Sequence, residues 1–336
     1  MSIASRTKPK VFVARMIPDQ GLDLLQQHYD VDVWSDQLPP SREMLLQRVQ
    51  GVAGILSLLT DRIDGDVMDA AGPSLKVISN MAVGYDNVSV ADATRRNLPI
   101  GNTPGVLTET SADFTWALLM AAARRVVEAD AYVRAGRWQT WEPKLLLGQE
   151  ITGTTLGIIG FGRIGKEVAK RARGFDMRVL YLASTPRDDP DATRLDAHRV
   201  DLDTLLRESD FVSVHTPLTP QTRLLIDAAA LSKMKRTAIL INTARGPVVD
   251  SAALYDALKQ GIIAYAALDV TDPEPIPTDS PLLQLPNIVI APHIASASIA
   301  TRGKMARMAA QNVIAGVTGE RLPHCVNPEV YDHASI

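Results

Sequence analysis

The sequence predicts an α/β protein with two doubly wound parallel-sheet domains, one of them inserted into the other. Short apolar segments alternate with segments of helical periodicity along most of the 336 residues, a pattern typical of βαβ units. A glycine-rich turn follows one apolar segment near the middle of the chain. The length suits two domains rather than one.

The first hundred residues form one complete alternating unit. Strands separated by single helices pair in parallel, so this part predicts one parallel sheet. The alternation stops at Thr103-Pro104-Gly105, and a helix rich in alanine, leucine and methionine is expected after it, at 109–125. The expected strands are 11–14, 31–34, 54–59, 75–81 and 98–101, and the expected helices are 20–28, 40–49, 64–71 and 88–96.

A strand–turn–helix–strand segment at 154–182 organises the second unit. Its first strand, 156–160, runs into the sequence GFGRIG. In such a G-x-G-x-x-G turn the first glycine permits the sharp bend, the second lets a pyrophosphate approach the backbone, and the third lets the helix pack closely. The helix N-terminus then faces the phosphates. A Rossmann-like dinucleotide site is therefore predicted, rather than a ligand-free glycine turn, at Gly160, Phe161, Gly162, Arg163, Ile164 and Gly165.

The residues after the second strand of this segment bear on the choice of cofactor. A carboxylate there would bind the ribose 2′-hydroxyl of NAD, but the chain has Ala183, followed by Ser184, Thr185 and Arg187. Two hydroxyls and an arginine suit a 2′-phosphate. NADP(H) is therefore expected as the preferred cofactor, and NAD(H) remains possible. The alternative is that Arg187 is only a solvated loop charge beside two aspartates.

The alternation resumes after this segment. Because the helix expected at 299–318 lies beyond the last strand of the second unit, we expect it to return to the first domain. Residues 1–102 and 296–336 would form a flavodoxin-like substrate domain, and residues 103–295 the inserted dinucleotide-binding domain. The remaining expected helices are 202–208, 228–234 and 251–260, and the remaining expected strands are 211–216, 238–242, 265–270 and 288–290.

Composition excludes several classes of function. The formal net charge of -3 gives no reason to expect nucleic acid or an anionic membrane as a partner. Cys325 is the single cysteine, so neither a disulfide framework nor a thiolate metal cluster is expected, and no metal site is predicted. No apolar run is long enough to cross a bilayer, and no apolar region follows the basic residues near the N-terminus. A cytoplasmic enzyme is the default expectation.

Polar residues follow three of the later strands, where open α/β sheets bind their ligands. Arg245 follows the strand 238–242 and His293 follows the strand 288–290. Asp269 lies near the end of the strand 265–270, and Glu274 follows that strand. The guanidinium of an arginine can hold a carboxylate or polarise a carbonyl. A histidine can give a proton to the oxygen as hydride reaches the carbon, and a carboxylate can orient its other ring nitrogen. This set suits hydride transfer to a 2-oxo acid.

Each of these residues also has a simpler interpretation. A lone histidine after a strand is usually structural or exposed, and five other histidines are interpreted in that way. His215 is the best rival acid, because it also lies at a strand end facing the cofactor. Asp272 precedes Pro273 and Glu274 lies between Pro273 and Pro275, so the two acids could form only a rigid acidic loop.

Several separated segments closely resemble the D-isomer-specific 2-hydroxyacid dehydrogenases. The resemblance covers about Val11 to Pro328 and is strongest to the glyoxylate/hydroxypyruvate reductases within that family. Several matches in the right order are more specific than any one motif. The matching segments are 82–87, 102–108, 160–165, 243–246, 269–275 and 292–294.

The resemblance implies roles for residues at matching positions. Arg245, Glu274 and His293 match the catalytic arginine, glutamate and histidine of the family. Backbone amides of Val83 and Gly84 match the loop that binds the substrate carboxylate together with the arginine. The cofactor site would comprise the glycine turn, Ala183, Ser184, Thr185, Arg187, Thr216, Pro217, Thr243, Ala244, Asp269, His293 and Ala295.

The resemblance also implies a homodimer built largely through the cofactor domains. The segment Trp138–Pro143 resembles a part of the reductases that reaches the active site of the partner subunit, although Trp141 could equally be an ordinary interface aromatic. Two departures stand out. Ala295 replaces the usual glycine, and Ser184 stands where many NADP-preferring relatives have arginine.

The activity that follows from these expectations is the reduction of glyoxylate, hydroxypyruvate or both, to glycolate or D-glycerate, by hydride transfer from NAD(P)H with His293 as the general acid/base. Two alternatives stay open. One is a related enzyme for another small 2-oxo acid or oxyanion, such as the D-lactate or phosphite couple. The other is a non-catalytic NAD(H)-sensing interaction protein.

Overall fold

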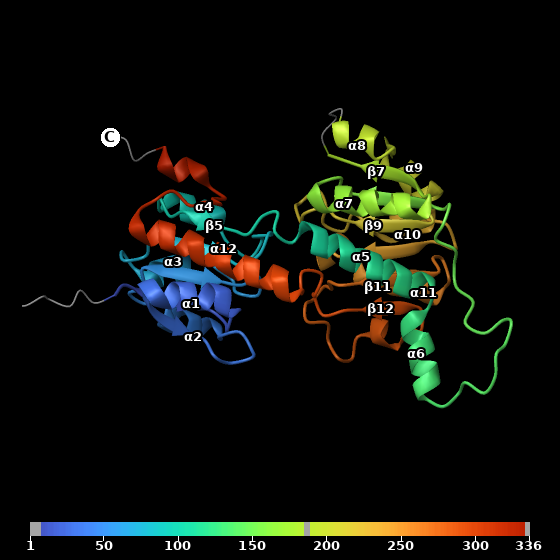
Figure 1. Cartoon of the computed structure of the whole chain (residues 1–336), viewed down its shortest axis with the longest axis horizontal. Coiled ribbons are helices and arrows are strands. Elements are labelled where there is room, and N and C mark those ends of the chain that lie inside the picture. Colours follow the sequence, from blue (N-terminus) through green and yellow to red (C-terminus); the bar gives the residue numbers. More distant parts are fainter. Residues whose placement is uncertain (1–7, 185–188, 333–336) are drawn as a thin grey trace, which may run out of the picture. The chain divides into compact units, whose positions relative to one another are not determined.

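The chain divides into two compact units in the computed structural model, which describes residues 8–184 and 189–332. Unit 1 consists of residues 1–107 and 298–336, and unit 2 of residues 108–297. Each is a parallel sheet covered by helices (Figure 1). The predicted fold class, two doubly wound parallel-sheet domains with one inserted into the other, is confirmed. The unit boundaries fall at 107/108 and 297/298 rather than at 102/103 and 295/296.

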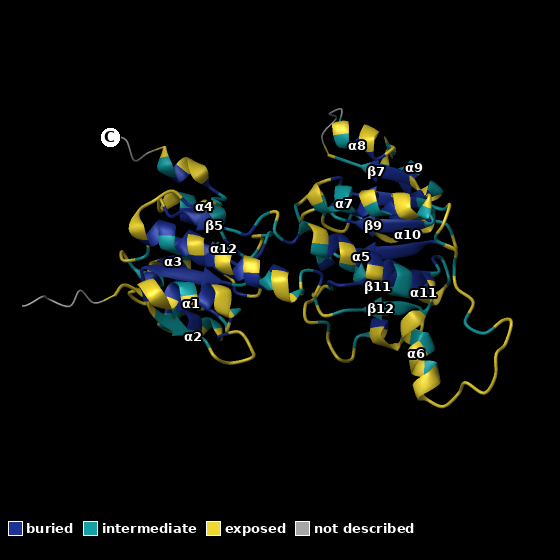
Figure 2. Cartoon of the chain, viewed as in Figure 1, coloured by how far each residue is buried: buried dark blue, intermediate teal, exposed yellow. Residues whose placement is uncertain are grey.

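Unit 1 has a five-stranded parallel sheet. The strands are β1 (Lys10–Val13), β2 (Asp30–Val33), β3 (Gly54–Ser57), β4 (Val77–Asn80) and β5 (Ile100–Gly101), and the helices are α1 (Asp19–His28), α2 (Arg42–Arg48), α3 (Gly65–Ala71), α4 (Val90–Arg95) and α12 (Ile299–Thr318). The strand order is β2-β1-β3-β4-β5. Helix α12 packs on α1, β3 and β4, so the C-terminal segment returns to unit 1 as expected. Residues of α2, α3 and α4 cover the other face. Strands β1, β3 and β4 are largely buried between the helices, whereas the edge strand β2 is partly exposed (Figure 2).

Unit 2 has a seven-stranded parallel sheet in the order β12-β11-β10-β9-β6-β7-β8. Its first part consists of α5 (Thr108–Ala123), α6 (Val126–Arg134), β6 (Thr155–Ile159), α7 (Arg163–Ala172), β7 (Arg178–Leu182), α8 (Pro190–Arg194), β8 (Ala197–Arg199) and α9 (Leu202–Glu208). It continues with β9 (Phe211–Val214), α10 (Ala228–Lys233), β10 (Ile239–Asn242), α11 (Ser251–Lys259), β11 (Tyr265–Leu268) and β12 (Ile288–Ile290). The strand order reverses between β6 and β9. Ligands bind outside the carboxyl ends of strands at such a switch point.

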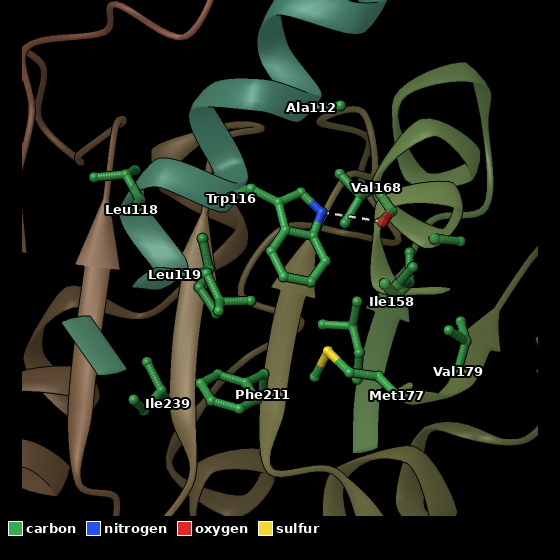
Figure 3. Packing of buried hydrophobic residues seen from close by; sticks show 14 of the residues in the cluster. Ala112, Trp116, Leu118, Leu119, Ile158, Val168, Met177, Val179, Phe211 and Ile239 are labelled. Atoms are coloured by element: carbon green, nitrogen blue, oxygen red, sulfur yellow. Dashed lines mark hydrogen bonds between the residues drawn. The ribbon is translucent and has the colours of Figure 1, made fainter. Parts of the chain in front are cut away.

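Trp116 of α5 helps to fix the helix that follows the glycine turn. Its indole N–H donates to the carbonyl oxygen of Val168 in α7 at 3.1 Å (Figure 3). Its ring also stacks on Phe175, with the centroids 4.9 Å apart. Ile158 of β6 and Phe211 of β9 belong to the same buried cluster. Burying the ring while satisfying the N–H lets this one side chain hold α5 against α7.

The helices of unit 2 differ from the prediction in several places, including α8, for which no helix was expected. The helix expected at 109–125 ends at Ala123, because Arg125 has a left-handed backbone with φ 53°. The chain then forms α6, which has no buried residue. No helix in the described part of the chain is long and apolar enough to cross a membrane.

Candidate active site

The glycine turn joins β6 to α7 and leaves open space above its middle residue. Gly160 has φ +97°, and a Cβ there would lie 2.7 Å from the carbonyl carbon of His215. A Cβ on Gly165 would overlap the carbonyl oxygen of Gly160. A Cβ on Gly162, in contrast, would meet no atom of residues 8–184 and 189–332 within 4 Å. The first and third glycines are therefore required by packing, whereas packing among these residues does not require the second.

The N-terminus of α7 fits a pyrophosphate group. Gly162 occupies the N-cap and has no side chain that could accept a hydrogen bond from the first turn, which also contains no acidic residue. The first N–H groups of a helix and its dipole attract anions. Arg163 is the first residue of the helix, and its side chain is exposed. The open space at Gly162 and this uncapped helix end together fit the phosphates of a dinucleotide.

The structure describes only some of the residues that were expected to bind the ribose of the cofactor. Ala183 is half-buried after β7, and its carbonyl oxygen accepts a hydrogen bond from Arg199 at 3.0 Å. Ser184 is exposed, and Thr185 and Arg187 lie outside the described residues. Further along, the Lys166 ammonium lies 2.8 Å from a carboxylate oxygen of Asp189. Hydrogen bonds to Asp189 and Asp191 raise the pKa of Lys166.

His293 and Glu274 are in direct contact. The distance from His293 Nδ1 to Glu274 Oε1 is 2.6 Å, and the two side chains are 22% and 34% exposed. This contact occupies Nδ1, so Nε2 is the ring nitrogen left to face a ligand. His293 follows β12 in a left-handed backbone conformation, with φ 55°. The pair that the sequence suggested as proton donor and orienting carboxylate is therefore formed in the structure.

Asp269 holds the turn that carries His293. Its buried carboxylate accepts the N–H of Ile294 at 2.7 Å and that of Ala295 at 2.8 Å, while its carbonyl oxygen accepts the N–H of His293 at 2.8 Å. Burial raises the pKa of Asp269, although these two N–H groups oppose that effect. Three hydrogen bonds to one residue explain how His293 can keep a left-handed conformation, which an L side chain rarely adopts.

Arg245 lies in a tight turn after β10. The side-chain amide of Asn242, which ends the strand, donates to the carbonyl oxygen of Arg245 at 2.9 Å and accepts the N–H of Ala244 at 3.0 Å. The hydroxyl of Thr243 lies 2.9 Å from that of Thr115 in α5. The next residue, Gly246, must be glycine because a Cβ would overlap the carbonyl oxygen of Thr271. The Arg245 turn is thus packed against the segment that leads to Glu274.

The rival acid His215 is unsuited to donate a proton. Burial lowers its pKa to about 3, so its ring is neutral near pH 7. Its Nε2 also lies 2.7 Å from the hydroxyl of Ser213. Thr216 and Pro217 follow His215 just beyond the end of β9. Thr216 is half-buried and Pro217 is exposed. Among the histidines at strand ends of this sheet, the geometry favours His293 for proton transfer.

Unit 2 therefore gathers most of the predicted site on one edge of its sheet. The glycine turn, Thr216, Thr243, Arg245 and His293 all follow the carboxyl ends of parallel strands. Sequence reasoning missed Asn242 and Asn80, whose side chains shape the turns. An asparagine at the last position of a buried strand was the available signal.

Val83 and Gly84 lie in unit 1, in the loop after β4. The side-chain amide of Asn80 donates to the carbonyl oxygen of Gly84 at 3.0 Å, and that of Asn102 donates to the carbonyl oxygen of Val83 at 2.9 Å. The N–H of Thr103 donates to the carbonyl oxygen of Ala82 at 2.9 Å. The N–H groups of Val83 and Gly84 find no acceptor among residues 8–184 and 189–332. Both residues are partly exposed, so two amide donors remain for a ligand.

Comparison with known proteins places the chain in a family. Residues 116–295 match the model of the D-isomer specific 2-hydroxyacid dehydrogenase, NAD binding domain. A glyoxylate reductase of Korarchaeum cryptofilum is 55% identical over 324 residues, which cover 96% of this chain and 97% of the relative. A glyoxylate reductase of Thermococcus kodakarensis is 48% identical over 328 residues, 96% of this chain and 97% of that one.

Solved structures agree with the sequence comparison. The TT0316 protein from Thermus thermophilus has a TM-score of 0.89 and 48% identity, covering 94% of this chain and 99% of that one. A second structure is that of an NADPH-dependent glyoxylate/hydroxypyruvate reductase from Sinorhizobium meliloti, solved with NADP and malonate. It has a TM-score of 0.83 and 31% identity, and the match covers 96% of this chain and 98% of that one. The chain therefore belongs to the D-isomer specific 2-hydroxyacid dehydrogenases, and it is an oxidoreductase that uses a nicotinamide dinucleotide.

Proposed function

We propose that the protein reduces glyoxylate to glycolate, with hydroxypyruvate as a second substrate and NADPH as the preferred reductant. The observation that carries the proposal is the contact of 2.6 Å between His293 and Glu274, on the same sheet edge as Arg245 and the glycine turn. The relatives that span the chain are named glyoxylate reductases, and one neighbour of known structure is named a glyoxylate/hydroxypyruvate reductase.

Each residue has one task in this proposal. In unit 2 the guanidinium of Arg245 is a group suited to bind a carboxylate, and in unit 1 the amides of Val83 and Gly84 are donors suited to the same kind of group. The bound nicotinamide supplies the hydride that reaches the carbonyl carbon. His293 gives a proton from Nε2 to the carbonyl oxygen, which becomes the hydroxyl of the product. Glu274 holds Nδ1 and stabilises the charged imidazole before that transfer.

Turnover of a panel of 2-oxo acids tests the substrate. Glyoxylate, hydroxypyruvate and pyruvate are each supplied with NADPH under the same conditions. We expect the highest kcat/KM for glyoxylate or hydroxypyruvate. A clear preference for pyruvate would replace the proposed substrate by a bulkier 2-oxo acid. NADPH binding without turnover of any compound would favour a cofactor-sensing protein.

The preference for NADPH rests on the absence of a carboxylate where β7 ends. Ala183 occupies that position, and the nearest described acid beyond it, Asp189, is engaged by Lys166. Because residue 183 is alanine, no carboxylate repels a 2′-phosphate there. The hydroxyl of Ser184 and the guanidinium of Arg187 are groups that suit a 2′-phosphate. We expect a kcat/KM about tenfold higher with NADPH than with NADH, the effect of one charge-assisted hydrogen bond.

The test of cofactor choice compares both nucleotides with one substrate. Arg187→Ala should remove the preference by weakening NADPH use while leaving NADH use unchanged, and Arg194→Ala in α8 is the control because it pairs with Asp191. Equal or better turnover with NADH in the unmodified protein would overturn the preference and leave the rest of the proposal standing.

We further propose that the protein forms a homodimer through α6 and the segment that follows it. Helix α6 and the segment after it are largely exposed (Figure 2). They carry large apolar side chains, of which Trp141 is the most exposed at 78%. Exposed apolar residues gathered in one region mark an interaction surface. Family resemblance favours a second copy of the chain as the occupant. The members are Val126, Val127, Val133, Trp138, Trp141 and Leu147.

Charged substitutions on α6 test the dimer. The unmodified protein should sediment with twice the mass of one chain, and the double variant Val126→Asp/Val127→Asp should sediment as a monomer. Aspartate suits the first turn of a helix, so α6 should persist in the variant. Leu38→Asp, at a leucine of unit 1 that is more exposed than either valine (74% against 53%), should remain dimeric. A monomeric unmodified protein would exclude the proposal.

A further inference from the structure

The loop that carries Val83 and Gly84 is held by its carbonyl groups rather than by its amides. The carbonyl oxygen of Ala82 accepts the N–H of Thr103 at 2.9 Å. The carbonyl oxygen of Val83 accepts the side-chain amide of Asn102 at 2.9 Å. These two donors are consecutive residues that directly follow β5. One short segment therefore fixes two successive peptide groups of the loop.

The orientation of these carbonyls determines where the amides point. In a trans peptide group the N–H points away from the carbonyl of the preceding residue. Fixing the carbonyl of Ala82 therefore directs the N–H of Val83, and fixing that of Val83 directs the N–H of Gly84. Both N–H groups are left without an acceptor in the described part of the chain. Because one of the two peptide groups is fixed by a side chain, a substitution can release it.

Asn102 is itself rigidly placed. Its carbonyl oxygen accepts the side-chain amide of Asn312 at 3.0 Å, and its N–H donates to the carbonyl oxygen of His324 at 3.2 Å. Asn312 is completely buried on α12. A Cβ on Gly101 would lie 2.7 Å from the Asn312 amide nitrogen, so the close approach of strand and helix requires glycine there. The donor that fixes the Val83 carbonyl thus belongs to a preorganised frame.

We propose that Asn102 is a positioning residue for the substrate carboxylate, because its hydrogen bond to the Val83 carbonyl directs the N–H of Gly84 toward the ligand. The inference rests on the proposed function, in which that N–H binds the carboxylate of a 2-oxo acid. Asn102 itself touches neither substrate nor cofactor in this role. A preorganised donor binds an anion better than one that must first reorient.

The test removes the side-chain amide while keeping the size of the side chain. Asn102→Leu should raise KM for glyoxylate and Kd for oxamate, an unreactive 2-oxo carboxylate, each about tenfold, which is the effect of one hydrogen bond. The kcat at saturating glyoxylate and the Kd for NADPH should stay close to those of the unmodified protein. A general loss of structure would instead change all four quantities and the thermal unfolding midpoint.

A matched control separates positioning from loss of a loop hydrogen bond. The side-chain amide of Asn287 in unit 2 donates to two loop carbonyls, those of Leu258 and Ala264, at 3.2 and 3.1 Å. Asn287→Leu should lower stability without changing KM for glyoxylate or Kd for oxamate. If Asn102→Leu does not fold, Asn102→Ala takes its place, with the same expected direction for both constants.

The outcomes distinguish the inference from the function on which it rests. An unmodified protein that neither reduces glyoxylate nor binds oxamate would refute the proposed function. An active unmodified protein together with a folded Asn102 variant whose KM and oxamate Kd are unchanged would refute the positioning role alone. Equal changes in the Asn102 and Asn287 variants would also refute it.

Discussion

Replacing His293 with alanine is expected to lower kcat for glyoxylate about a thousandfold, which is within the usual contribution of a positioned general acid. The variant loses the imidazole that the Glu274 carboxylate contacts at 2.6 Å. The Kd for NADPH should change little, because the open turn at Gly162 and the N-terminus of α7 are untouched. Stopped-flow and steady-state absorbance of NADPH at saturating glyoxylate measure the effect.

His198→Ala is the matched control for this variant. His198 is also close to a carboxylate, with Nε2 at 3.7 Å from Asp196 Oδ1, but it is exposed on the edge strand β8. Its removal should leave kcat unchanged. If His293→Ala turned over glyoxylate as fast as the unmodified protein, His293 could not be the proton donor and a solvent molecule or another residue would have to serve.

Gly162→Asp is expected to raise Kd for NADPH about a hundredfold, the loss of strong hydrogen bonds to a charged group. A Cβ at this position meets no atom of the described residues within 4 Å, so the fold should tolerate the change. The aspartate would fill the space above the turn and place a negative charge where the pyrophosphate is expected. Fluorescence titration with NADPH measures the binding.

The Gly162→Asp substitution should raise the stability of the nucleotide-free protein although it weakens NADPH binding. Aspartate is a better N-cap than glycine by roughly a few tenths of a kcal/mol, so the free energy of unfolding without nucleotide should rise slightly. Gly174→Asp is the control, because Gly174 is also exposed and its Cβ would likewise meet no atom within 4 Å in the part of the chain that the structure describes. It should leave NADPH binding unchanged. Unaltered NADPH binding by Gly162→Asp would place the dinucleotide elsewhere.

The fold was largely predictable because its signals are local. Alternation of apolar strands and helices predicts parallel sheets wherever both faces are covered. The glycine turn carries its own geometric reasons, since Gly160 and Gly165 are required by close packing. Helix α6 was not predicted as a separate element: the helix expected at 109–125 stops at Ala123, and the left-handed backbone of Arg125 separates α6 from it.

The chemical residues of the site were easier to predict than the residues that place them. Arg245, Glu274 and His293 have side chains suited to the chemistry and follow predicted strands. Asn102 acts through a single hydrogen bond to the Val83 carbonyl, a role that the sequence did not indicate. Asp269 was expected near the site, but its hydrogen bonds to the turn after His293 were not. Such contacts join residues far apart in the sequence, so no spacing or periodicity records them.

The transfer of hydride to glyoxylate is the central claim, and isotope labelling tests it most directly. The unmodified protein is supplied with glyoxylate and NADPH that carries deuterium on both C4 positions, and the product is examined by mass spectrometry and proton NMR. We predict glycolate with one deuterium at C2 for each NADPH oxidised. NADPH oxidation without deuterated glycolate, or glycolate without deuterium, would contradict the proposed reaction.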